Sequence, residues 1–161
     1  LARFAEYRAA RIAFLESLGL GHSNRDPVAE FSEHVVCSVL GGTLTACRTQ
    51  KDWDAQTPGY GRVQVKYVAD PERSTGGNWL NIVIADQADA FALVVLERLV
   101  PKAIHVFTRE SLASCYDALG KTHANRGTQL NFTGVVHDRV MADPAAFERL
   151  GVKTFVLEGT V

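Results

Sequence analysis

The run FALVVL at 91–96 is the feature that most constrains how this chain folds. It is far shorter than the roughly 20 residues that a helix needs to cross a bilayer. Successive side chains of a strand point to opposite faces of the sheet, so an unbroken apolar run indicates a strand that is covered on both faces. The run therefore predicts a strand inside a sheet that carries other elements on each side.

Further helix and strand patterns surround this run. Helical spacing of apolar residues is found or expected at 1–18, from Pro27 to Gly41-Gly42, at 109–119 and over 134–150. Strand-like segments lie at 43–49, 78–85, 91–97, 103–108 and 153–157, with a hairpin at 52–68, and 120–129 has no periodicity and predicts a loop. These patterns predict an α/β fold with a central mixed sheet flanked by helices, in a single domain over residues 1–161.

The composition excludes several classes of protein. A chain of 161 residues with 47% hydrophobic and 22% charged residues is typical of one soluble globular domain. It contains no signal-peptide pattern, so we expect a cytoplasmic protein with no membrane partner. Its 3 cysteines have no paired spacing, which argues against a disulfide framework or a thiolate zinc site. The net charge of -1 excludes a strongly basic nucleic-acid binder but leaves room for a local basic surface.

The second helix carries two glutamates at different angles to its apolar stripe. Asp26 is a suitable N-cap, and Pro27 suits the first helical position. Stepping about 100° per residue puts Glu33 at the edge of the stripe, beside Leu40, whereas Glu30 faces away. We therefore expect Glu33 to be able to point inward.

The hairpin DWDAQTPGYGRVQVKYV brings an acid, an amide and an amine close together. In its second arm Arg62, Gln64 and Lys66 share one face, and the apolar residues between them share the other. Asp54 is the preferred acid of the first arm, with Asp52 as the alternative. A half-exposed strand with a solvated lysine is the simpler interpretation of the same pattern.

The loop of the hairpin decides whether Asp54 can join the polar face. An even loop would put Asp54 opposite Val65 and on the wrong face of the sheet. An odd loop, or a bulge near Gly59 or Gly61, is required to bring Asp54 beside Gln64.

The order of a helical Glu33, a strand Asp54 and the strand segment Gln64-Val65-Lys66 resembles the PD-(D/E)xK nuclease superfamily, the fold of many restriction endonucleases. The stretch WDAQTPGYGRVQVK is also similar to an uncharacterised actinobacterial-type group with a QxK variant of that motif. The resemblance implies a restriction endonuclease-like core at about 27–108, preceded by an N-terminal helix at 1–18 and followed by C-terminal helices and a strand at 109–157.

The resemblance also implies a catalytic set of Lys66, Glu33, Asp54 and Gln64. Asp54, the Gln64 side-chain oxygen and the Val65 carbonyl would hold Mg²⁺, with Mn²⁺ as the alternative ion, and Glu33 would bind it through water. Lys66 would orient the attacking water or stabilise charge on phosphorus. Gln64 stands where the motif has a second acid, and because an amide brings no charge, we expect weaker metal binding.

The loop GKTHANRGTQ adds candidate nucleic-acid contacts, because flexible backbone is combined with side chains that bind phosphates or base edges. The candidates are Lys121, His123, Asn125 and Arg126, and a plain solvated loop is the alternative. Together these features predict a Mg²⁺-dependent DNA endonuclease that acts as a homodimer and uses no organic cofactor. A non-catalytic nucleic-acid-binding or assembly module on the same fold is the second hypothesis, and an ordinary α/β domain with a wet hairpin is the third.

Three histidines are assigned no catalytic role. We expect His105 to be a hydrogen-bonded or partly buried strand residue and His34 to lie on the surface. The neighbours His137 and Asp138 diverge by about 100° on a helix, and no serine or cysteine is placed to serve them as a nucleophile.

Overall fold

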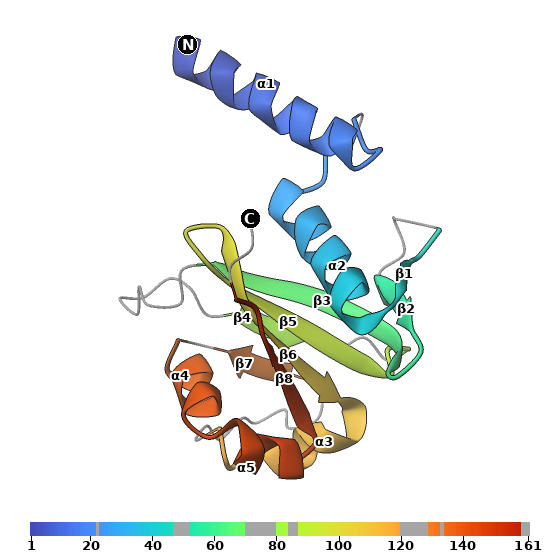
Figure 1. Cartoon of the computed structure of the whole chain (residues 1–161), viewed down its shortest axis with the longest axis vertical. Coiled ribbons are helices and arrows are strands. Elements are labelled where there is room, and N and C mark those ends of the chain that lie inside the picture. Colours follow the sequence, from blue (N-terminus) through green and yellow to red (C-terminus); the bar gives the residue numbers. More distant parts are fainter. Residues whose placement is uncertain are drawn as a thin grey trace.

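A six-stranded mixed sheet with helices on both faces forms the body of the molecule (Figure 1). The computed structural model describes residues 1–21, 23–46, 52–69, 80–83, 87–119, 129–132 and 134–158. The α/β class and the mixed sheet flanked by helices are confirmed. The helices are α1 (Ala2–Ser17), α2 (Pro27–Leu40), α3 (Arg109–Cys115), α4 (Gly134–Ala142) and α5 (Pro144–Arg149). The strands are β1 (Thr43–Leu44), β2 (Ala55–Thr57), β3 (Gly61–Ala69), β4 (Leu80–Val83), β5 (Ala90–Glu97), β6 (Val100–Thr108), β7 (Gln129–Phe132) and β8 (Val152–Val156).

The strand order of the sheet is β1-β2-β3-β5-β6-β8. β1, β2 and β3 form an antiparallel meander, β3 and β5 run parallel, and β5, β6 and β8 are again antiparallel to their neighbours. α2 covers one face, and α3, α4 and α5 lie on the other (Figure 1). The sheet is thus covered on both sides, as the central apolar run requires.

The predicted double-faced strand is β5. Residues 91–96 are all fully buried. Phe91, Leu93 and Val95 pack into the core under α3, α4 and α5, and the alternate residues pack under α2. Phe91 stacks on Phe107 of β6 with ring centroids 4.9 Å apart. Alternation along a strand that is buried on both faces accounts for the unbroken apolar run.

Helix α2 has the predicted start and stop. Asp26 is the N-cap, and its side chain accepts a hydrogen bond of 3.0 Å from the Val28 amide. The chain leaves the helix at Gly41, whose φ of 68° is the left-handed conformation that glycine adopts without steric cost. The Tyr67 hydroxyl of β3 donates to the other oxygen of Asp26, which fixes the start of α2 over the sheet.

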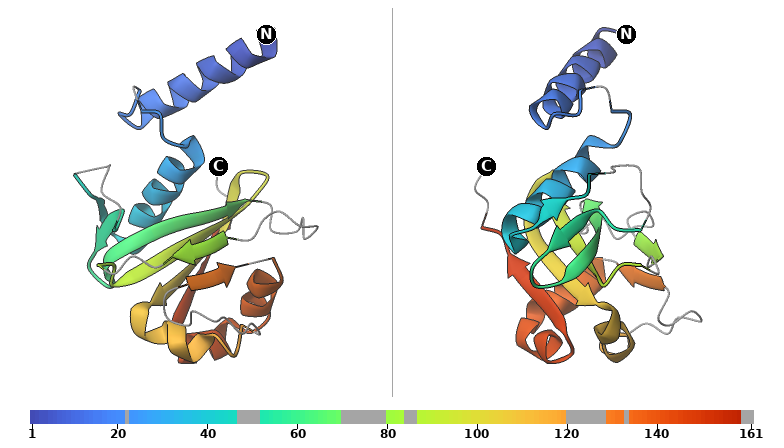
Figure 2. Two further views of the ribbon diagram at one scale, coloured as in Figure 1. Left: turned by 180° about the vertical axis from the view of Figure 1, so that it is seen from behind. Right: turned by 90° about the vertical axis from the view of Figure 1, so that its right-hand side faces the viewer.

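Helix α1 extends away from the body of the molecule and touches it mainly at α2 (Figure 2). Among the described helices, none is long and apolar enough to cross a membrane.

One strand was missed. Gln129, predicted to end a loop, begins β7, which pairs antiparallel with β4 in a separate two-stranded sheet. The segment QLNF has no strong strand pattern of its own, so its pairing with a strand far away in the sequence was not visible there.

Candidate active site

The hairpin has the odd loop that the candidate site requires. Thr57 pairs with Gly61, so three residues, Pro58 to Tyr60, form the turn. Gly61 has a φ of 66°, and a Cβ at this position would lie 2.6 Å from Asp89 Oδ2, so the turn requires glycine. The paired register ends at Ala55, which lies opposite Val63. Asp54 precedes β2, and its amide also bonds to the Val63 carbonyl. The odd loop that the prediction required is therefore present, but the strand pairing does not itself place Asp54 opposite Gln64.

Asp54 is held by two hydrogen bonds at the edge of β3 that faces β2. Its backbone amide donates to the Val63 carbonyl at 2.9 Å, and its Oδ2 accepts from the Val65 amide at 2.8 Å. β2 begins only at Ala55, so the carboxylate takes the place of the backbone acceptor that a longer β2 would offer to Val65. This bond fixes a negative charge beside the Gln64-Val65-Lys66 segment.

Gln64 and Lys66 lie on the same face of β3. In the parallel register Gln64 pairs with Phe91 and Lys66 with Leu93, so both side chains are on the face covered by α3, α4 and α5. Gln64 is buried, with 6% of its surface exposed, and Lys66 is half-buried. In a strand the amide and carbonyl of one residue point the same way, so the Val65 carbonyl faces the edge where Asp54 lies.

Arg62, the third polar residue on the same face of β3 as Gln64 and Lys66, forms an ion pair with Asp89. Its guanidinium makes two hydrogen bonds to Asp89, of 3.0 Å and 2.9 Å, and it lies over the Trp53 ring. The Arg62 hydrogen bonds lower the pKa of Asp89 to about 2. This contact ties the start of β5 to the start of β3.

Glu33 approaches from the other side of the sheet. It is buried on α2, which packs on the face that carries Val63 and Val65. Its Oε1 accepts a hydrogen bond of 2.8 Å from Arg25. The structure therefore holds the Asp54 carboxylate at the Val65 amide, between Gln64 and Lys66 along β3, and it places Glu33 in an ion pair on the helix that covers the other face of the sheet.

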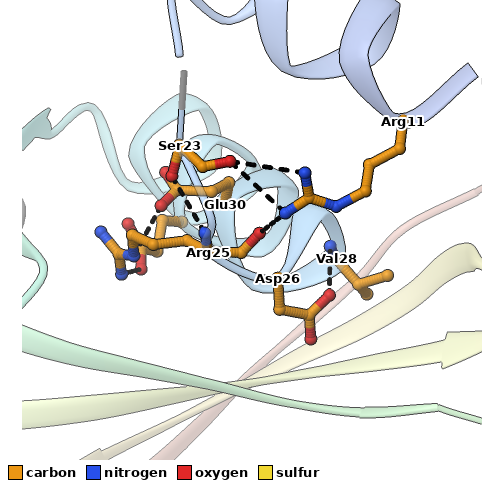
Figure 3. A network of polar contacts seen from close by, with 7 residues as sticks. Arg11, Ser23, Arg25, Asp26, Val28 and Glu30 are labelled. Carbon is orange, nitrogen blue, oxygen red and sulfur yellow. Dashed lines mark hydrogen bonds and ion pairs between the residues drawn. The ribbon is translucent and has the colours of Figure 1, made fainter. Parts of the chain in front are cut away.

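Arg25 also contacts Glu30, which corrects one prediction. Glu30 was expected to face away from the core, but it is 0% exposed, and its Oε1 lies 2.7 Å from Arg25 Nε. The connector before α2 folds back along the helix and lays Arg25 over both glutamates (Figure 3). A helical wheel shows only the residues of α2, so it could not predict a contact with Arg25, which precedes the helix.

Arg11 of α1 holds the same connector from the opposite side (Figure 3). Its guanidinium donates to the carbonyls of Arg25, at 2.6 Å, and Ser23, at 3.4 Å. The Arg25 amide in turn donates to the Ser23 hydroxyl at 3.1 Å. The position of Arg25, and with it the charge balance at Glu33, therefore depends on how α1 docks.

A second buried polar cluster, which sequence reasoning missed, lies under α4. His105 Nε2 is 3.0 Å from His137 Nδ1, and His105 Nδ1 is 3.0 Å from the Thr154 hydroxyl. Burial, and to a smaller extent His137, lowers the pKa of His105 to about 3. Burial also lowers the pKa of His137, although Asp138 and Glu97 act in the opposite direction. His105 is the hydrogen-bonded strand residue that was expected.

The predicted nucleic-acid contacts Lys121, His123, Asn125 and Arg126 lie outside the described residues. Within the described ranges, no group of three or more His, Cys, Asp or Glu side chains could hold a metal ion. The set implied by the resemblance has only two carboxylates, at Asp54 and Glu33, with amide and carbonyl oxygens as the other ligands.

Comparison of the chain with models of known protein families and with curated proteins finds no match. A function therefore has to be assigned from the geometry and chemistry of the residues themselves.

Proposed function

We propose that this chain is a Mg²⁺-dependent endonuclease that hydrolyses DNA phosphodiester bonds at the edge of β3. The observation that carries the proposal is the 2.8 Å hydrogen bond from the Val65 amide to Asp54 Oδ2, which holds a carboxylate against the β3 backbone between Gln64 and Lys66. The chain order α2, β1, β2, β3 is the helix and three strands that the resemblance implies, and it supports a restriction endonuclease-like core.

The oxygens at this edge suit a hard cation. Asp54 keeps its second oxygen for a metal, the Val65 carbonyl faces the same edge, and Gln64 supplies an amide oxygen. Mg²⁺ prefers such oxygen ligands and retains several waters, and Mn²⁺ is the alternative ion. When bound, the ion would neutralise phosphate charge and make a bound water more acidic. Because Asp54 is the one carboxylate at this edge among the proposed ligands, we expect weak binding.

Lys66 has an electrostatic role in this proposal. It is half-buried two residues from Gln64 on the same face, where an ammonium group can contact a phosphate oxygen and orient the attacking water. Glu33 is paired with Arg25, so it acts on the metal only through water or after that ion pair opens. We therefore expect Asp54 and Lys66 to matter more for the reaction than Glu33.

The test is nicking of supercoiled plasmid DNA by the purified chain with Mg²⁺ or Mn²⁺. We expect the wild type to nick and Lys66→Ala to lose about 100-fold or more in rate. Lys102→Ala is the matched control, since it removes a partly exposed lysine from β6 without touching the site. A wild type without metal-dependent nicking, or a Lys66→Ala variant as active as Lys102→Ala, would remove the catalytic proposal.

A non-catalytic DNA-binding or assembly module on the same fold is the second candidate. It is favoured by Gln64 in place of an acid and by the engagement of Glu33 with Arg25. It predicts DNA binding that weakens steeply with salt and does not respond to divalent ions.

The proposed enzyme is a homodimer. One chain supplies one such edge, and a DNA duplex has two strands, so two copies are needed to cut both strands in one binding event.

A further inference from the structure

A pocket of about 460 Å³ lies between α1, α2 and the β5–β6 hairpin, away from the proposed catalytic edge. Pockets of this volume with mostly apolar walls are typical of binding sites. The walls that matter here are aromatic and aliphatic: Tyr7, Phe14, Phe31, Leu96, Leu99 and Val100.

Large apolar side chains are exposed around this pocket. Phe4 and Tyr7 of α1 are 67% and 58% exposed, and Leu99 is 61% exposed. α1, which carries Phe4, extends beyond the body of the molecule (Figure 2). A cluster of exposed apolar side chains next to an apolar hollow marks an interaction surface.

The hairpin tip gives an independent sign of function. Glu97 pairs with Val100, so Arg98 and Leu99 form a two-residue turn, and their φ angles are 49° and 65°. Such turns favour Asn-Gly, because a residue with a large side chain is strained at positive φ. The chain thus keeps an exposed, strained leucine at the pocket where glycine would be more stable. Strain of this kind is retained where the side chain is used.

We propose that this surface binds a second copy of the chain, with the first turns of each α1 lying in the pocket of the other copy. A two-fold interface requires a projection and a complementary hollow on the same face of one chain. Phe4 and Leu99 supply the projections and the pocket supplies the hollow. A small apolar ligand would fill the pocket but leave Phe4 in water.

A stable interface buries roughly 1,200 Å² or more in total. The interface proposed here therefore includes α1, which is about 24 Å long, together with the pocket and the hairpin tip of each copy. The rim is polar and already bonded, since Arg11 holds the Arg25 carbonyl and Asp26 caps α2. An apolar centre with a satisfied polar rim is the usual anatomy of an interface.

This inference gives the proposed homodimer its interface but does not depend on catalysis. It is tested by sedimentation of the whole chain over a range of concentrations, without DNA or metal. We expect a monomer–dimer equilibrium in which Phe4→Glu and Leu99→Gly each weaken association by about tenfold or more. The matched control is Val135→Glu, because Val135 is 59% exposed on α4, on the other side of the sheet. That variant should associate like the wild type.

Leu99→Gly also separates lost association from lost folding. Because glycine relieves the turn, its melting temperature, measured at a concentration where the wild type is monomeric, should equal or exceed that of the wild type. A chain that stays monomeric at every concentration would overturn the inference, and so would a dimer that survives both substitutions. DNA nicking by a monomer would contradict the dimer interface but not the hydrolytic proposal. A dimer that does not nick DNA would contradict the hydrolytic proposal but not the interface.

Discussion

The two faces of the sheet bury polar groups in different ways. Under α2, Arg25 lies between two buried carboxylates, of Glu30 and Glu33. Under α4, His105 and His137 share a hydrogen bond, and burial keeps both neutral at ordinary pH. The polar groups under α2 are therefore ion pairs, whereas those under α4 are neutral hydrogen-bonded side chains.

The difference follows from what each side of the sheet can supply. The connector before α2 brings in a guanidinium, whereas His105 bonds to a second imidazole and to a hydroxyl, which carry no fixed charge. A buried charge is tolerated only when it is paired and hydrogen-bonded. Charge is therefore tolerated under α2, where Arg25 pairs with both carboxylates, and the following changes test that comparison.

Removing the cation of the first cluster should have the largest effect on stability. Arg25→Ala leaves Glu30 and Glu33 buried without it, and we expect a loss of about 3 kcal/mol, at the low end for buried pairs because Arg25 is 33% exposed. Urea unfolding at neutral pH measures the change. Arg3→Ala, in an exposed pair with Glu6, is the control and should cost less than about 0.5 kcal/mol. Equal losses in the two variants would show that the buried cluster does not depend on its charge.

Acid should weaken the second cluster by a smaller amount. The pKa of His105 is lowered to about 3 in the fold, so below the ordinary value of 6.5 the unfolded chain binds a proton that the folded chain does not. Its contribution to stability is present above 6.5 and is lost as the pH falls, by roughly 2 kcal/mol at about pH 5. Urea unfolding as a function of pH measures this, and His105→Gln should flatten the dependence. An unchanged slope in that variant would contradict the assignment.

The Thr154 hydroxyl should contribute least. Thr154→Val removes the 3.0 Å hydrogen bond to His105 but leaves both histidines. We expect a loss of about 1 kcal/mol at neutral pH, because His105 loses a buried hydrogen bond. The slope of stability against pH should remain that of the wild type, and a flattened slope would mean that the Thr154 hydrogen bond, rather than burial, keeps the pKa of His105 low.

Local signals predicted much of the fold. The Asp26 cap, Pro27 and the final glycines fixed the ends of α2, and the unbroken apolar run identified β5. The alternation of side chains along a strand predicted that Asp54 could join the polar face only across an odd hairpin loop or a bulge, and the loop is odd. Each of these features depends on residues that are close together in the sequence, so a local pattern is enough to predict it.

Contacts between distant residues were not predictable in the same way. Glu30 is buried because the connector folds back over α2, and β7 forms only against β4. His105 and His137 are 32 residues apart, and only the fold makes them partners. At the candidate site, alternation grouped Gln64 with Lys66, but no local pattern indicated that Glu33 would be held by Arg25.

The most direct test of the account compares Mg²⁺-dependent DNA cleavage by the wild type, Asp54→Asn and Asp52→Asn. Asp54 bonds to the Val65 amide, and Asp52 lies two residues before it, farther from the start of β2 at Ala55. We predict that Asp54→Asn folds but loses about 100-fold or more in rate, while Asp52→Asn cleaves like the wild type. Equal rates in the two variants, or no metal-dependent cleavage by the wild type, would contradict the claim that the edge of β3 is the active site.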